Sequence, residues 1–264
     1  MNHPWTMPLN AAAIQAACTG EIGREIIHFD ETSSTNEEAR RLGEAGAPHG
    51  MVVVADYQQQ GRGRRGSAWI SPPKRNLLCS VLLRPQWPMQ HWSRLTHAAA
   101  LAILFALEHS GIAPKIKWPN DLYVGQRKIA GILLESASGC GGSFVVAGFG
   151  VNVNMPAEDF PPSLRLDVTS VLMETGNAQA REPLLAAILN HFDHYARRAE
   201  QAFPDLLEQI RSYSLLLHRR IHLHIQGTVR HGTVVGFSPE GGLLLESTSG
   251  EREEILSADQ VRLA

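Results

Sequence analysis

Short apolar runs rich in β-branched residues recur along the first part of the chain. They predict buried strands at residues 26–29, 51–57, 76–83 and 143–154. Two further runs flank Gly125-Gln126, a pair suited to the turn of a β-hairpin. We therefore expect this part of the chain to be built around a sheet.

Apolar residues at helical spacing separate these strands. They predict helices at residues 10–17, 34–42, 91–109 and 182–212. The second should begin with a capping box, in which Ser34 is the N-cap and Glu37 follows three residues later, and Gly43 and Gly46 should end it. The apolar face of the third is expected to form core rather than to bind a cofactor.

The pattern changes at His218. Short strands are predicted at 221–225, 229–237, 242–247 and 253–256, separated by glycine-rich turns, and this favours a small SH3-like β-barrel. We accordingly expect an N-terminal extension (1–25), a large domain (26–217) and a small C-terminal domain (218–264).

The composition is that of an ordinary globular protein, with 264 residues of which 44% are hydrophobic and 19% charged. Three widely separated cysteines favour neither disulfides nor a zinc site, and they fit a reducing cytoplasm. His222 and His224 alternate with apolar residues, which suits an exposed strand face better than a metal site. No signal peptide or membrane span is evident, so we expect a cytoplasmic protein. From the cysteine and histidine patterns we expect no metal site.

The most unusual stretch is Gly61-Arg62-Gly63-Arg64-Arg65-Gly66, directly after a predicted strand. Glycines let the backbone approach a ligand and arginines suit carboxylate or phosphate, so the loop could close over a small anion. A solvated surface turn remains the plain alternative. A dinucleotide-binding turn is disfavoured because Pro72 and Pro73 oppose the helix that it needs. A nucleic-acid patch is disfavoured by the net charge of −2.

A second polar group surrounds the predicted hairpin. The turn at Lys117-Trp118-Pro119-Asn120-Asp121 carries more charged, amide and aromatic side chains than a turn requires. Asp121 is either an Asx-turn residue or a site residue that pairs with a lysine or positions a metal-bound nucleotide. Lys128 is either a solvated edge charge or a cation that holds a carboxylate or phosphate. Ser34-Thr35-Asn36 could cap a helix or offer hydroxyl and amide groups to a neutral ligand.

Together these stretches resemble the biotin–protein ligase family. The resemblance covers most of residues 28–155, in the family's order, and the motifs that carry it are Ser34-Thr35-Asn36, Tyr57-Gln58-Gln59-Gln60-Gly61-Arg62-Gly63-Arg64-Arg65-Gly66 with Trp69, Lys117-Trp118-Pro119-Asn120-Asp121-Leu122, Arg127-Lys128-Ile129-Ala130-Gly131-Ile132-Leu133 and Gly148-Phe149-Gly150-Val151-Asn152.

The resemblance implies an α+β fold: a mixed, mostly antiparallel sheet with helices, like that of class II aminoacyl-tRNA synthetases, plus the SH3-like barrel. It implies formation of biotinyl-5′-AMP from biotin and ATP, with Mg²⁺ accompanying ATP, and transfer of biotin to a lysine of a biotin carboxyl carrier protein domain, as in acetyl-CoA carboxylase. A homodimer is possible. Some family members carry an N-terminal DNA-binding domain; the match begins near residue 26, so we expect no DNA binding and no membrane partner.

The same resemblance implies the site residues. Lys128, Arg62 and Asp121 would carry the chemistry. The biotin-binding residues would be Ser34, Thr35, Asn36, Gln58, Gln59, Gly61, Arg62, Gly63, Arg64, Lys128 and Gly131. The ATP and adenylate residues would be Arg64, Arg65, Trp69, Lys117, Asn120, Asp121, Lys128 and Asn152.

Three other functions are weighed against this one. A lipoate ligase or octanoyltransferase shares the fold, but the arginine loop and Lys-Trp-Pro-Asn-Asp favour biotin. A non-catalytic biotin sensor would not need the adenylate-handling residues. A dehydrogenase is disfavoured by the prolines after Gly66.

Overall fold

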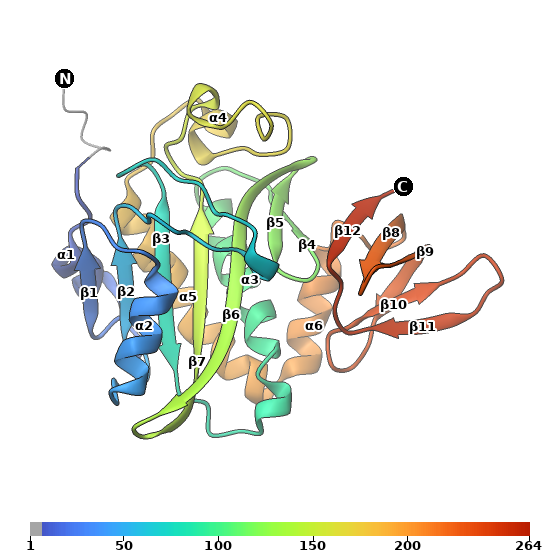
Figure 1. The fold of residues 1–264 in the computed structure, drawn as a ribbon, viewed down its shortest axis with the longest axis horizontal. Helices are drawn as coiled ribbons and strands as arrows, with labels where there is room; N and C mark the ends of the chain where they lie inside the picture. Colours follow the sequence, from blue (N-terminus) through green and yellow to red (C-terminus); the bar gives the residue numbers. More distant parts are fainter. Residues whose placement is uncertain (1–6) are drawn as a thin grey trace.

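The computed structural model describes residues 7–264 and contains two sheets (Figure 1). The larger sheet has seven strands in the order β1-β2-β3-β7-β6-β5-β4. Only β1 and β2 pair in parallel. The strands are β1 (Ile26–Phe29), β2 (Val52–Ala55), β3 (Leu77–Leu83), β4 (Lys115–Lys117), β5 (Asp121–Val124), β6 (Arg127–Gly139) and β7 (Gly142–Val151).

Helices cover this sheet on both faces. One face carries α3 (Arg94–Glu108) and α5 (Arg181–Gln201), joined by α1 (Ala11–Ala17) and α6 (Phe203–Ser212). The other carries α2 (Thr35–Glu44) beside a smaller apolar cluster. Because both faces are covered, β2 and β3 are buried along their whole length, which explains their continuous apolar sequences. Within residues 7–264, this part also contains a short helix, α4 (Val171–Thr175), and 3₁₀ turns at Arg64–Gly66, Met89–His91 and Ala157–Asp159.

The second sheet is antiparallel, with its five strands in the order β11-β10-β9-β8-β12. The predicted fold class is thereby confirmed. The strands are β8 (Arg220–Ile225), β9 (Thr228–Phe237), β10 (Leu243–Glu246), β11 (Arg252–Ile255) and β12 (Gln260–Leu263), and β12 was not predicted. The predicted domain boundary falls between α6 and β8; the division into two domains stays a prediction.

Two predictions about α2 are wrong. Ser34 is the N-cap residue, but its side chain makes no capping hydrogen bond, and Glu37 instead accepts a hydrogen bond from Ser33 Oγ. The helix also continues through Gly43 to Glu44, so it ends before Gly46 rather than at Gly43. A Cβ at Gly43 would lie 2.7 Å from Leu82 Cδ1, so this glycine lets the helix pack closely on the sheet.

Two other boundaries differ from the sequence prediction. The long helix at 182–212 is two helices, because Ala202 leaves helical geometry (φ −147°, ψ 48°) and Pro204 lies in the first turn of α6, where its missing N–H costs nothing. Strand β7 ends at Val151, so Asn152 and Asn154 lie beyond it and are held by side-chain hydrogen bonds.

The described part of the N-terminal extension is fixed to the large sheet and its helices. The Leu9 N–H donates to the carboxylate of Asp56, and the N–H groups of Glu21 and Ile22 donate to Asp193 Oδ1. Residues 1–6 of the extension lie outside the described residues. Within 7–264, no helix has both the length and the apolar character to cross a membrane.

The C-terminal sheet meets the large sheet around Gly241. Trp118 Nε1 donates to Gly241 O (3.0 Å), and Arg94 Nη2 lies 2.8 Å from Glu240 Oε2. His97 of α3 is buried at the same junction, with its ring beside that of Phe203. Burial lowers the pKa of His97 to about 4, although a hydrogen bond with the Gly241 backbone opposes the shift.

We expect this junction to make the protein sensitive to mild acid. The unfolded chain binds a proton at this histidine below pH ~6.5, whereas the folded chain does so only near pH 4. The stabilisation is thus complete above pH ~6.5 and is lost as the pH falls toward 4, by at most about 3 kcal/mol. Urea unfolding at pH 7.5 and 5 should show the loss in the wild type and a flatter dependence in His97→Gln. The exposed His218→Gln variant should keep the wild-type slope; an unchanged slope in His97→Gln would refute the assignment.

Candidate active site

A cleft of about 1070 Å³ lies on the α2 face of the large sheet. Its walls come from the loop at 61–69, the β4–β5 turn and strand β12 of the C-terminal sheet. It brings together segments far apart in the sequence. The predicted residues that line it are Ser34, Thr35, Asn36, Gln58, Arg62, Gly63, Arg64, Arg65, Trp69, Lys117, Asn120, Asp121, Lys128 and Gly131.

Three predicted residues do not line the cleft. Gln59 is exposed and donates to Glu31 Oε1 (2.5 Å). Gly61 is buried in the base of the loop, where its carbonyl accepts from Trp69 N (2.8 Å). Asn152 is 3% exposed and both ends of its amide are engaged, by Thr169 O and Asn76 Nδ2. These residues support the site's framework rather than presenting side chains to its interior.

One end of the cleft is neutral and polar. Gln58 Oε1 accepts from the Thr35 backbone N–H (2.7 Å) and lies 3.0 Å from Thr35 Oγ1. With its oxygen so engaged, the Gln58 amide nitrogen is left as a donor. The neighbouring Thr35 hydroxyl offers acceptor lone pairs. This end can therefore pair with a group that carries both N–H and C=O.

The floor of the cleft is formed by glycines of β6 and β7. Gly131 and Gly150 are register partners, and the Trp69 ring packs against both. A Cβ at Gly150 would lie 2.6 Å from Trp69 Cζ2, so the indole can lie flat on the sheet only because this position has no side chain. Trp69 Nε1 is buried without a hydrogen-bond partner among the described residues.

The other end of the cleft is cationic. Lys128 Nζ lies 2.6 Å from Asp121 Oδ1 and 5.7 Å from the centre of the Trp69 ring. Burial lowers the pKa of Lys117, and the nearby charges of Lys128 and Arg262 lower it further while Asp121 opposes them. Across the cleft as a whole, six Lys or Arg side chains face three Asp. This excess of positive charge, in a protein whose net charge is −2, suits an anionic ligand.

The arginine loop is attached to three different elements. Arg62 Nη2 lies 2.7 Å from Glu37 Oε1 on α2, and Arg64 Nη1 donates to Asn120 Oδ1 (3.3 Å) in the β4–β5 turn. Arg65 pairs with Asp259, beside β12. Burial, followed by the charge of Arg65, lowers the pKa of Arg64. The loop is thus a bridge over the cleft, which argues against a simple solvated turn.

Several residues of the cleft were not singled out from the sequence. Tyr123 and Gln126 of the hairpin line it, as do Asp167 and the segment 258–263. For the segment 258–263, the local signal in the sequence is the short alternation of polar and apolar residues at Gln260-Val261-Arg262-Leu263, which becomes β12.

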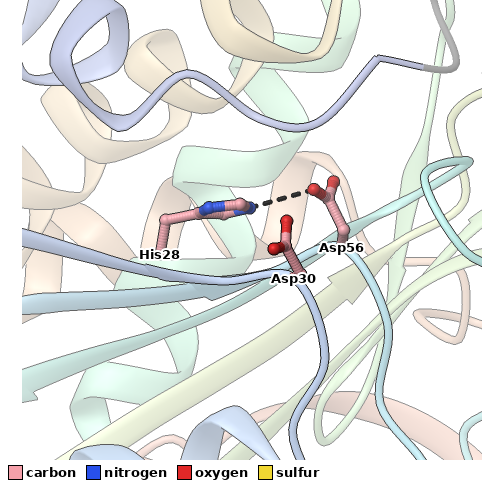
Figure 2. A group of neighbouring side chains, drawn as sticks. All are labelled: His28, Asp30 and Asp56. Carbon is pink, nitrogen blue, oxygen red and sulfur yellow. Dashed lines mark hydrogen bonds and ion pairs between the residues drawn. The ribbon is translucent and has the colours of Figure 1, made fainter.

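A possible metal-binding group lies elsewhere. Within 7–264 only His28, Asp30 and Asp56 bring three potential ligand atoms together (Figure 2). Asp56 is buried and already pairs with His28 Nε2 (2.9 Å) and Arg181 Nη2 (2.9 Å). Because the guanidinium of Arg181 already neutralises this carboxylate, the group is better explained as a network that holds the N-terminal segment against α5.

The chain is similar in sequence to known proteins. Residues 28–152 match the biotin/lipoate A/B protein ligase family. A biotin–[acetyl-CoA-carboxylase] ligase of Mycobacterium tuberculosis is 32% identical over 248 residues, covering 90% of this chain and 88% of that protein. A protein of Bacillus spizizenii named as a bifunctional ligase/repressor is 34% identical over 244 residues, covering 91% of this chain and 75% of that protein.

The fold has a matching solved structure. The biotin protein ligase of Aquifex aeolicus in complex with biotin and ATP superposes with a TM-score of 0.80 at 29% identity. The superposition covers 91% of this chain and 100% of that one.

Proposed function

This chain belongs to the biotin–protein ligase family, and we propose that its cleft forms biotinyl-5′-AMP from biotin and ATP, releasing pyrophosphate, and then transfers the biotinyl group to a lysine of an acceptor protein. The acceptor is the biotin carboxyl carrier protein domain of acetyl-CoA carboxylase or of a related enzyme. Related proteins are named for this activity.

The observation that carries the proposal is the pairing of a neutral end with a cationic end in one cleft. Biotin has a cyclic urea, with N–H and C=O groups, at one end and a carboxylate at the other. The Thr35 hydroxyl and Gln58 amide suit the urea, and Lys128, Arg62 and Arg64 suit the carboxylate and the ATP phosphates. Lipoate, the substrate of the sister enzymes, carries a dithiolane in place of the urea and would leave this polar end unpaired.

In the first step a biotin carboxylate oxygen attacks the α-phosphorus of ATP. A new P–O bond forms, the bond to the β-phosphate bridging oxygen breaks, and pyrophosphate leaves with its electron pair. The attacking carboxylate and the phosphates are both negative, so Lys128 and the arginines lower the barrier by stabilising that charge. Asp121 holds Lys128 beside the floor of the cleft.

In the second step the uncharged ε-amine of the acceptor lysine attacks the carbonyl of biotinyl-5′-AMP. An amide forms, AMP leaves, and the amine loses a proton. We propose that Mg²⁺ enters as a part of the ATP substrate and that the enzyme acts in the cytoplasm, which the three free cysteines favour. The absence of DNA binding and the possible homodimer remain predictions.

The test is biotin-dependent exchange of pyrophosphate into ATP by the purified wild-type chain, followed by labelling of a carrier domain. We expect exchange with biotin and none above background with lipoate. Biotin binding without exchange would indicate a sensor, and exchange with lipoate alone would indicate the sister activity; either result would overturn the proposal.

A further inference from the structure

Lys128 lies where the regular pairing of the large sheet is interrupted. The pairing of β6 with β7 begins at Ala130, two residues after Lys128, and the pairing of β6 with β5 passes over Ile129. Such a bulge turns the neighbouring side chain in a new direction and breaks the ladder locally, so that backbone groups must be paired elsewhere. On the side of β7, the backbone of Lys128 therefore needs a partner from another part of the chain.

That partner is the segment 167–169, which precedes α4. The Lys128 N–H donates to Asp167 O (2.8 Å), and Lys128 O accepts from the Thr169 N–H (2.9 Å). Together these bonds form a short parallel bridge between Lys128 and Val168. The segment, with β5 on the other side, thus fixes the backbone from which the Lys128 side chain enters the cleft.

Glu174 of α4 attaches the segment 167–169 to the β5–β6 hairpin. Its Oε1 lies 2.7 Å from Nη2 of Arg127, the residue directly before Lys128, and it also accepts a hydrogen bond from Thr169 Oγ1. The Glu174 side chain is only 16% exposed, so salt screens its ion pair less than it would screen a pair on the open surface. One carboxylate therefore joins the two stretches of chain that meet at Lys128.

The other side-chain bonds of this region hold the segment to a different element. Asn152 Nδ2 donates to Thr169 O (3.0 Å), and Ser170 Oγ donates to Met155 O (2.6 Å). Asn152 and Met155 belong to the chain that follows β7, so these bonds leave the distance to the hairpin free. Among the described residues, the side chain whose polar bonds link the segment to the hairpin is that of Glu174.

We propose that Glu174 is a positioning residue for Lys128. By holding Arg127 and the segment 167–169 together, it keeps the Lys128 ammonium beside Asp121, where it can stabilise the charge of the transition state. Neither Glu174 nor Arg127 lines the cleft, so both act through Lys128. The inference rests on the proposed function and deepens it, because it states what holds the group that serves the chemistry.

The test is a double-mutant cycle in biotin-dependent pyrophosphate exchange. Glu174→Ala should lower kcat about tenfold, less than the ~100-fold cost of a 1 Å misplacement, because the backbone bonds to the segment 167–169 remain. Glu174→Gln can still accept from Thr169 but loses the ion pair with Arg127, and it should lose about threefold. The matched control is Glu158→Ala, an exposed glutamate in the same connection between β7 and α4, which should exchange at the wild-type rate.

The decisive readout is the effect of Glu174→Ala in the Lys128→Ala background. There it should change the residual exchange less than about twofold, because no ammonium is left to misplace. An equal loss in both backgrounds would indicate a general structural role and overturn the inference, as would a wild-type kcat in Glu174→Ala.

A second variant keeps the test decisive should Glu174→Ala fail to fold. Arg127→Gln breaks the same ion pair from its more exposed side, where the side chain is 40% exposed. We expect a loss of about threefold that disappears in the Lys128→Ala background, and persistence of the loss there would overturn the inference. Failure of the wild type to exchange pyrophosphate with biotin would instead refute the proposed function.

Discussion

Lys128→Ala is expected to lower biotin-dependent pyrophosphate exchange by about 10²–10³-fold, the scale of removing one preorganised group that stabilises transition-state charge. Lys128 Nζ lies at the junction of the glycine floor, Trp69 and Asp121. Its removal leaves Asp121 as an unpaired negative charge where two anions must meet. The loss should appear in kcat as well as in the KM for biotin, and steady-state exchange measured over both substrates separates the two.

Lys115→Ala is the matched control for this experiment. Lys115 lies two residues before Lys117 on β4, but it is exposed and its Nζ lies near Ser212 O, away from the cleft. It should exchange at the wild-type rate. If Lys128→Ala retained exchange within tenfold of the wild type while keeping its melting temperature, Lys128 would have no part in the chemistry.

Much of the fold and the site could be predicted because their signals are local. Strands such as β2 and β3 are buried on both faces, so each appears as one unbroken apolar run. The β4–β5 turn and the hairpin place Lys117, Asn120 and Asp121 near Lys128 through short-range connections. The loop at 61–66 was recognisable because glycines and arginines together are unusual after a buried strand.

The remaining features depend on contacts that leave no local pattern. Glu37 has the spacing of a capping residue, yet its carboxylate pairs with Arg62 of the loop. Asp259 pairs with Arg65, although most of the large domain lies between them in the sequence. Asn152 ends a motif that predicts a ligand-binding residue. However, β7 ends before it, and its side-chain amide forms hydrogen bonds with Asn76 and Thr169 instead. Such pairings are decided by tertiary packing.

Gly150→Ala is expected to lower kcat/KM for biotin by about 100-fold, the cost of a misplacement near 1 Å in a catalytic arrangement. The new methyl group would lie 2.6 Å from Trp69 Cζ2, so the indole must leave the floor. The Trp69 backbone N–H donates a hydrogen bond to Gly61 O, and a displaced indole therefore shifts the base of the arginine loop with it. Exchange assays across biotin concentrations measure the effect.

The control separates displacement of the loop from damage to the sheet. Gly236→Ala also adds a methyl group to a strand glycine, but its nearest neighbour would be Leu244 Cδ1 at 3.7 Å, an ordinary contact. Alanine costs less conformational entropy than glycine in a strand, so Gly236→Ala should keep the wild-type stability. Normal activity in Gly236→Ala with loss in Gly150→Ala would locate the defect at Trp69. Restoration of activity by combining Gly150→Ala with Trp69→Phe, whose smaller ring can avoid the methyl group, would show that the overlap itself causes the loss; full activity in Gly150→Ala alone would refute it.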